Sequence, residues 1–126
     1  MKRLRFCAAS LVLTISAFTF TASYGQDPNW KPPGTEEAEA VEQANQQLDA
    51  VYQRLMSKLD EAGQNSLREA ERSWIKWRDN EAVLIARLGG AIGGSALRVD
   101  TLLAQHKLIR QRTEILKGYV TLADSN

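Results

Sequence analysis

Residues 66–88 constrain the fold of this chain most, because they combine a helix-start signal with a wide apolar stripe. Ser66 followed by Glu69 has the capping-box spacing, in which the two side chains satisfy free backbone N–H groups. We therefore expect a helix to begin at Leu67. Apolar residues then recur at three- and four-residue steps, which places them on one side of that helix. They are Leu67, Ala70, Trp74, Trp77, Leu84, Ile85 and Leu88. This side is predicted to face a core.

A carboxylate interrupts the apolar stripe. Glu81 projects into its middle, and Arg78 lies on its flank. Burying an unpaired charge is costly, so Glu81 predicts a cation that arrives from another segment. Arg112 lies within an apolar face of the last predicted helix and is the expected partner. We predict that Tyr52 joins Arg78, Glu81 and Arg112 in one hydrogen-bonded cluster that fixes how the helices dock.

Residues 1–25 have the pattern of a secretory signal peptide. Its parts are a basic start (Lys2, Arg3 and Arg5), an apolar stretch (6–20) and a small-x-small cleavage site (23–25). The apolar stretch is short for a bilayer span of about 20 residues, so no membrane span is expected in the mature chain. We predict an exported protein, periplasmic or secreted after cleavage near Gly25.

The mature chain is expected to be one small domain without disulfides. Removing residues 1–25 from the 126-residue chain leaves 101 residues and removes Cys7, the only cysteine. Helix packing alone must then hold the fold, unlike in many small exported domains. The remaining 13 basic and 15 acidic side chains give a net charge near −2, which argues against nucleic-acid binding.

The first part of the mature chain predicts an extended lead and then a helix. Residues 26–34 contain all three prolines and show no periodicity. A helix is expected from Thr35 to about Ala62, with Gly63 as its stop. Its predicted inward face consists of Val41, Ala44, Leu48, Val51, Tyr52, Leu55 and Leu59. The short connection to Ser66 predicts an antiparallel helical hairpin.

The last helix is predicted from about Ala96 to Val120 and has apolar residues on two sides, so it should contact both earlier helices. We therefore predict an all-α fold, a small three-helix bundle made of an antiparallel hairpin and a third packed helix. The helical domain is expected to span 35–122, followed by a tail at 123–126.

Residues 89–95 contain four glycines, which favour a flexible turn over a continuous helix. The segment lacks the lysine of a phosphate-binding loop. Exposed loops on rigid scaffolds often carry binding residues, and Ile92 would be the apolar tip of such a loop. The candidate binding residues are Asp79, Gly90, Ile92, Gly93 and Ser95.

No catalytic or metal site is predicted. His106 is the only histidine, and the mature chain has no cysteine, so neither metal nor cofactor is expected. No nucleophile motif surrounds a serine. Asp79 and Glu81 are two residues apart on one helix, so their side chains diverge by about 200° and cannot flank one glycosidic bond.

Two segments carry a resemblance to a known family. They are ANQQLDAVYQRL (44–55) and LREAERSWIKWRDNE (67–81), and 93–95 and 112–116 fit the same pattern. Together they resemble the LprI-like lysozyme-inhibitor domain over roughly 39–116, and Trp-Ile-x-x-Arg-Asp-x-Glu is the most specific element. The resemblance implies an exported helical domain that inhibits lysozyme.

The chain departs from this family pattern at two positions. Ala82 and Ala104 stand where many relatives carry cysteines, so a disulfide that joins them in relatives would be lost here. The function implied is binding of a lysozyme-type muramidase, whose paired carboxylates lie in a sugar-binding cleft that an inhibitor can fill. The alternative is an envelope interaction or structural module that does not inhibit lysozyme.

Overall fold

The computed structural model describes residues 27–125, and the predicted signal peptide at 1–25 lies outside the described residues. Within this range the chain forms three α-helices and no strand, which confirms the all-α prediction. The helices are α1 (Thr35–Met56), α2 (Glu61–Leu88) and α3 (Gly94–Asp124). No helix among the described residues is long and apolar enough to cross a membrane. Residues 27–30 belong to a separate unit and form a short turn.

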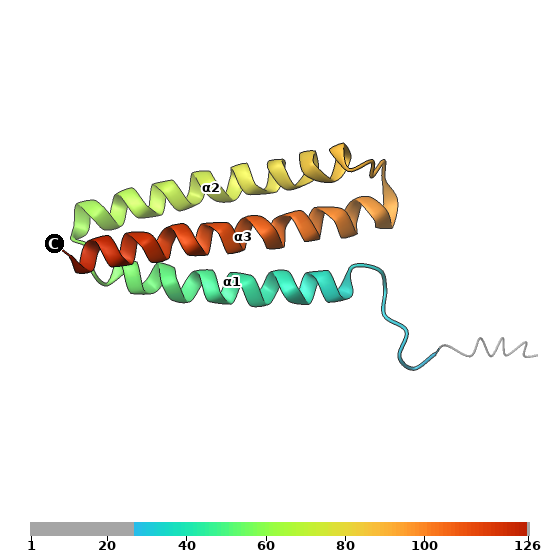
Figure 1. Cartoon of the computed structure of the whole chain (residues 1–126), viewed down its shortest axis with the longest axis horizontal. Coiled ribbons are helices and arrows are strands. Elements are labelled where there is room, and N and C mark those ends of the chain that lie inside the picture. The colour runs from blue at the N-terminus through green and yellow to red at the C-terminus, as the bar shows by residue number, and fades with distance from the viewer. Residues whose placement is uncertain (1–26, 126) are drawn as a thin grey trace, which may run out of the picture. The chain divides into compact units, whose positions relative to one another are not determined.

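Helix α3 lies between the other two helices, parallel to α1 and antiparallel to α2 (Figure 1). It packs against both, as its two apolar faces predict, while α1 and α2 make few direct contacts with each other. The predicted three-helix bundle is therefore confirmed. Its hairpin helices run in opposite directions, but α3 separates them along most of their length.

The main core joins α1 to the face of α3 that includes Ile109 and Leu116, both fully buried. Its buried members are Ala44, Leu48, Leu55, Leu67, Ile109, Leu116 and Val120. Only Leu67 comes from α2. The inward face predicted for the first helix is thus confirmed, because its members are either in this core or packed against it.

Helix α2 begins six residues before the predicted start at Leu67. Asp60 is the residue before the helix, and its side chain accepts a hydrogen bond from the backbone N–H of Gly63 at 2.8 Å. This is the role the sequence analysis gave to Ser66. Ser66 instead lies inside the helix, where its Oγ donates to the carbonyl of Ala62 at 3.0 Å. The prediction was wrong because an aspartate six residues upstream provides the cap.

Helix α1 ends at Met56 rather than near Ala62. The last carbonyls of a helix have no partner within it, and Gln64 of α2 supplies one here. Its Nε2 donates to the carbonyls of Met56 at 3.2 Å and Leu59 at 3.1 Å. The turn is therefore tied together by a side chain from the next helix.

A hydrogen-bonded turn ends α2 and begins the predicted glycine loop. The N–H of Ala91 donates to the carbonyl of Ala86 at 3.2 Å, and that of Gly90 to Arg87 at 3.0 Å. Gly90 has a positive φ of 96°, so this pair of hydrogen bonds is a Schellman motif. Ala91 is buried, whereas the side chain of Ile92 is 91% exposed. The loop thus presents Ile92 from an anchored base.

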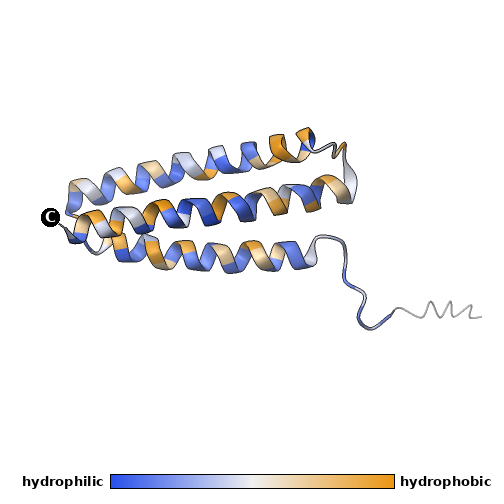
Figure 2. Cartoon of the chain, viewed as in Figure 1, coloured by the Kyte–Doolittle hydropathy of each residue, from blue (hydrophilic) through white to orange (hydrophobic). Residues whose placement is uncertain are grey.

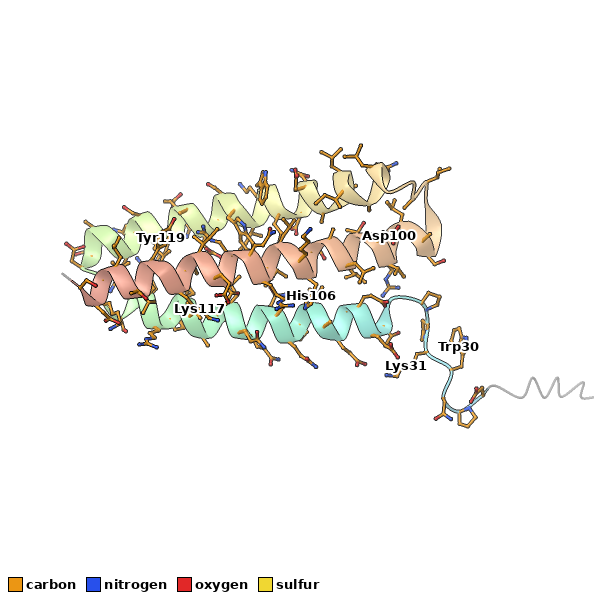
Figure 3. All side chains as sticks on the ribbon, in the orientation of Figure 1. Trp30, Lys31, Asp100, His106, Lys117 and Tyr119 are labelled. Atoms are coloured by element: carbon orange, nitrogen blue, oxygen red, sulfur yellow. The ribbon has the colours of Figure 1, made fainter. Side chains whose placement is uncertain are left out.

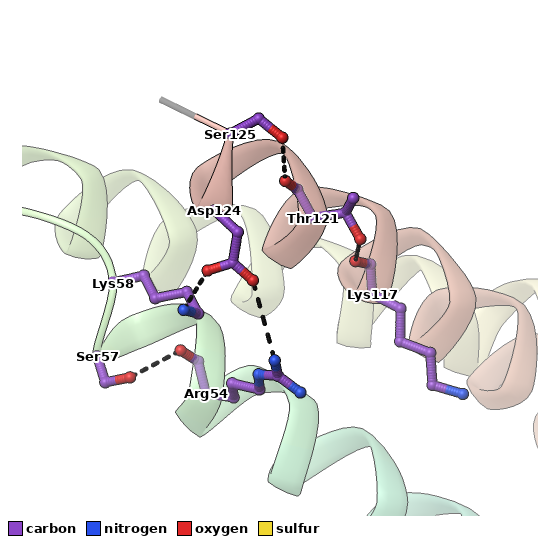
Figure 4. Close-up of polar contacts among 7 residues, drawn as sticks. All are labelled: Arg54, Ser57, Lys58, Lys117, Thr121, Asp124 and Ser125. Atoms are coloured by element: carbon purple, nitrogen blue, oxygen red, sulfur yellow. Dashed lines mark hydrogen bonds and ion pairs between the residues drawn. The ribbon is translucent and has the colours of Figure 1, made fainter.

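Helix α3 continues four residues beyond the predicted end at Val120. Asp124 in its last turn forms ion pairs with Lys58 and, at 3.9 Å, with Arg54 (Figure 4). These contacts fasten the end of α3 to the end of α1. Part of the predicted tail is therefore helical.

Two glycine substitutions test the Schellman motif assigned at the end of α2. Gly90 lies in that turn, and Gly118, inside α3, is the comparison. Gly90→Ala should lower the free energy of unfolding by about 1 kcal/mol, because an alanine at positive φ is strained. Gly118→Ala should raise it by about 0.5–1 kcal/mol, because Gly118 lies inside α3 with open space around it. Thermal unfolding followed by circular dichroism measures both. Equal effects of the two changes would contradict the assigned turn.

Candidate functional site

A buried ion pair joins α2 to α3. The Nε and Nη2 atoms of Arg112 donate to one carboxylate oxygen of Glu71 at 3.1 and 3.0 Å. The side chains are only 12% and 13% exposed. A pair this shielded depends on both partners, since removing one leaves an uncompensated charge.

The indole of Trp74 lies between two guanidinium groups. The central guanidinium carbon of Arg78 is 5.3 Å from the ring centroid and that of Arg112 is 5.6 Å away. Both distances allow cation–π attraction, which is stronger where water is excluded. Glu71, Trp74 and Arg78 follow one another at three- and four-residue steps on α2, a spacing that places them on one face. That spacing is the signal by which Glu71 could have been found in the sequence.

Asp79 belongs to the same interhelical contact. Its Oδ1 accepts from Arg78 Nε at 2.9 Å and Nη2 at 2.7 Å, and from Gln105 Nε2 of α3 at 3.1 Å. Asp79 was predicted as a binding residue and not as a member of the cluster, but the structure pairs it with Arg78. Asp79 remains half exposed, and its role as a binding residue stays a prediction.

The expected pairing of Glu81 with Arg112 is wrong. Two contacts define how α2 and α3 are aligned: Gln105 with Asp79, and Arg112 with Glu71. Between these contacts the chain advances seven residues along α3 and goes back eight residues along α2. This is the register of two antiparallel helices. Glu81 is ten residues from Glu71, which corresponds to roughly 15 Å along the helix axis. Arg112 is therefore out of its reach.

Tyr52 also stands apart from the predicted cluster. It has no side-chain hydrogen bond in the described part of the chain, and it lines a small hollow between α1 and α2 together with Glu71 and Ile75. The structure thus brings Arg78 and Arg112 to the same indole. Tyr52 lies beside their neighbour Glu71, and Glu81 lies elsewhere on α2.

The second half of α2 exposes apolar side chains that the sequence analysis placed in the core. Trp77 is 49% exposed, Leu84 50% and Leu88 79%. The buried residues here are Ala82 and Ala86. Because α2 has only α3 as a close neighbour, small residues form the contact and the larger ones remain uncovered. Figure 2 shows how strongly hydrophobic this end of α2 is.

We call Trp77, Leu84, Leu88 and Ile92 the exposed apolar edge. It runs along the second half of α2 and onto the loop, and Figure 3 shows side chains there projecting away from α3. The remaining predicted binding residues lie beside its tip. Gly90 forms the turn, Gly93 precedes α3, and Ser95 is exposed in the first turn of α3. Their role in binding stays a prediction.

Within 27–125, no group of three histidine, cysteine, aspartate or glutamate residues is placed to hold a metal ion. His106 is half-buried and lies on the side of α3 that faces α1 (Figure 3). It lines a shallow hollow with the basic residues Lys107 and Arg110.

Ala82 and Ala104 are packed together. Both are buried and form one small cluster with Leu108. These are the two positions at which the family resemblance implies cysteines. The structure therefore places both alanines in one buried cluster where a disulfide in relatives would join α2 to α3.

The profile of the family described as "Lysozyme inhibitor LprI" matches residues 36–116, which is well over half of the chain. No curated protein and no solved structure matches it significantly.

Substitutions at the buried ion pair test its importance. Arg112→Met should lower the free energy of unfolding by about 3 kcal/mol, because it leaves Glu71 buried without a cation. Glu81→Gln should change it little, since Glu81 has no partner among the described residues. Urea unfolding of both variants makes the comparison. If Glu81→Gln lowered the free energy of unfolding more than Arg112→Met does, the result would support the Glu81–Arg112 pair that the sequence predicted.

A restored disulfide tests the packing of the two alanines. The double variant Ala82→Cys/Ala104→Cys should oxidise to a disulfide and gain about 3 kcal/mol in the free energy of unfolding. Thiol titration measures the bond, and melting with and without reductant measures the gain. Either single cysteine variant is the control. Two thiols that stay free under oxidising conditions would show that the helices are further apart here.

Proposed function

The chain belongs to the LprI lysozyme-inhibitor family, and on this basis we propose that it binds and inhibits a lysozyme-type muramidase. The signal-peptide pattern at 1–25 supports action outside the cytoplasm, in the periplasm or cell envelope or after secretion. The proposed activity is binding alone. The chain need only exclude substrate from the enzyme's cleft, so no residue is assigned a catalytic role.

The observation that carries the proposal is the exposed tip formed by Leu88 and Ile92, which are 79% and 91% exposed. A contiguous exposed apolar patch on a small protein marks an interaction surface, and Leu88 and Ile92 are the end of the exposed apolar edge. Lysozyme-type enzymes bind their glycan in a cleft between two carboxylates. A projecting apolar tip has the shape to enter such a cleft.

The base of this tip supports the same proposal. The hydrogen bonds of Gly90 and Ala91 to the end of α2 hold the chain just before Ile92. A segment already held in its bound conformation loses less entropy on binding. We therefore assign Ile92 as the inserted residue, with Gly90, Gly93 and Ser95 shaping the loop around it.

A clearing assay tests this function. The purified chain without the predicted signal peptide should reduce lysis of cell walls by a panel of lysozymes in a dose-dependent manner. Ile92→Ser should weaken inhibition about tenfold or more, since it removes an apolar anchor from the centre of the contact. Ile115→Ser is the matched control, because Ile115 is a half-exposed isoleucine of α3 far from the loop.

The outcomes separate the possible functions. Equal inhibition by the wild type and Ile92→Ser would show that the tip is not the inserted element. No inhibition by the folded wild-type chain would overturn the proposal and leave an envelope interaction module.

A further inference from the structure

Glu81 lies within the exposed apolar edge. It follows Trp77 by four residues and precedes Leu84 by three and Leu88 by seven, so all four side chains share one side of α2. Glu81 is half-buried, whereas its three neighbours are exposed to a greater extent. The carboxylate is therefore surrounded by large apolar side chains on an accessible face.

This carboxylate has no partner in the part of the chain that the structure describes. Three of the other four carboxylates of α2 pair with an arginine: Glu69 with Arg72, Glu71 with Arg112 and Asp79 with Arg78. The fourth, Glu61, is exposed in the first turn of the helix. Glu81 has neither an ion pair nor a side-chain hydrogen bond within 27–125.

The surroundings of Glu81 explain why no internal cation reaches it. Arg78 is one turn away on the same helix, but its Nε and Nη2 atoms both donate to Asp79. The register of α2 against α3 places the stretch 101–105 opposite Glu81, and that stretch carries no charged side chain. Helix α1 makes few contacts with α2 and supplies no cation there.

We propose that Glu81 is a specificity-determining residue that pairs with a lysine or arginine of the muramidase when the exposed apolar edge docks. The proposal rests on the proposed function and extends the contact from the loop tip along α2. Docking would remove water from Glu81 by covering Trp77, Leu84 and Leu88. A carboxylate desolvated in this way is strongly unfavourable unless a cation meets it.

The same residue would then select among enzymes. An enzyme with a basic side chain flanked by apolar residues at the rim of its cleft satisfies Glu81. An enzyme whose cleft rim is neutral or acidic leaves the Glu81 carboxylate unpaired or repels it. Unpaired and like charges of this kind are how interfaces reject wrong partners. The mature net charge near −2 acts in the same direction, because it favours encounter with basic proteins.

The test compares charge removal at two sites on α2. Glu81→Gln should weaken binding to a muramidase that the wild-type chain inhibits by about tenfold or more. Between 50 mM and 500 mM NaCl, the affinity of this variant should also fall less than the affinity of the wild type. Glu69→Gln, an exposed glutamate nearer the start of α2, is the matched control and should leave affinity within about twofold. Calorimetric titration measures affinity, and circular dichroism confirms that both variants are folded.

Each result has a distinct meaning. Wild-type binding with unchanged affinity of Glu81→Gln would overturn the role of Glu81 while leaving the proposed function intact. Equal losses for the two variants would overturn it as well, because a general charge effect would then explain binding. Absence of wild-type binding to every lysozyme tested would overturn the proposed function and, with it, this pairing.

Discussion

The packing of α3 against both other helices is the constraint on which the rest of the structure depends. One face of α3 buries Ile109 and Leu116 in the core with α1, and another packs Ala104 and Leu108 against Ala82 of α2. Because α1 and α2 scarcely meet, α2 has a single close neighbour along its second half. The exposed apolar edge is the direct result, since large side chains beyond that narrow contact have nothing to cover them.

The α2–α3 contact combines two kinds of interaction. Near its middle, Arg112 pairs with Glu71 and shares the indole of Trp74 with Arg78. Further along, small residues allow close approach of the two backbones. The charged pair specifies one register, because a shift of α3 by one turn would leave Arg112 and Glu71 buried and unpaired. A chain without cysteines in its described bundle thus fixes its helices by charge and small-residue packing.

Local patterns predicted the helices and the inward face of α1, because residues such as Leu48 and Leu55 repeat with clear helical spacing. The predicted orientation of α2 was wrong because Trp77, Leu84 and Leu88 dominate its apolar pattern, whereas alanines make its contact with α3. The partner of Arg112 was also wrong. It depends on the register between segments far apart in the sequence, which helical periodicity within each segment does not determine. For the candidate site, the sequence identified Ile92 as a tip but gave no indication of the exposed edge behind it.

The central position of α3 also bears on how the chain folds. Its core partners in α1 are separated from it in sequence by the whole of α2, so the main core consists largely of long-range contacts. During synthesis, α1 and α2 emerge first and make few contacts with each other. The nascent chain therefore lacks a complete core until residues near Ile109 to Val120 have been made. Because the core is closed by contacts between segments far apart in sequence, we expect the domain to fold more slowly than a bundle whose consecutive helices pack directly against each other.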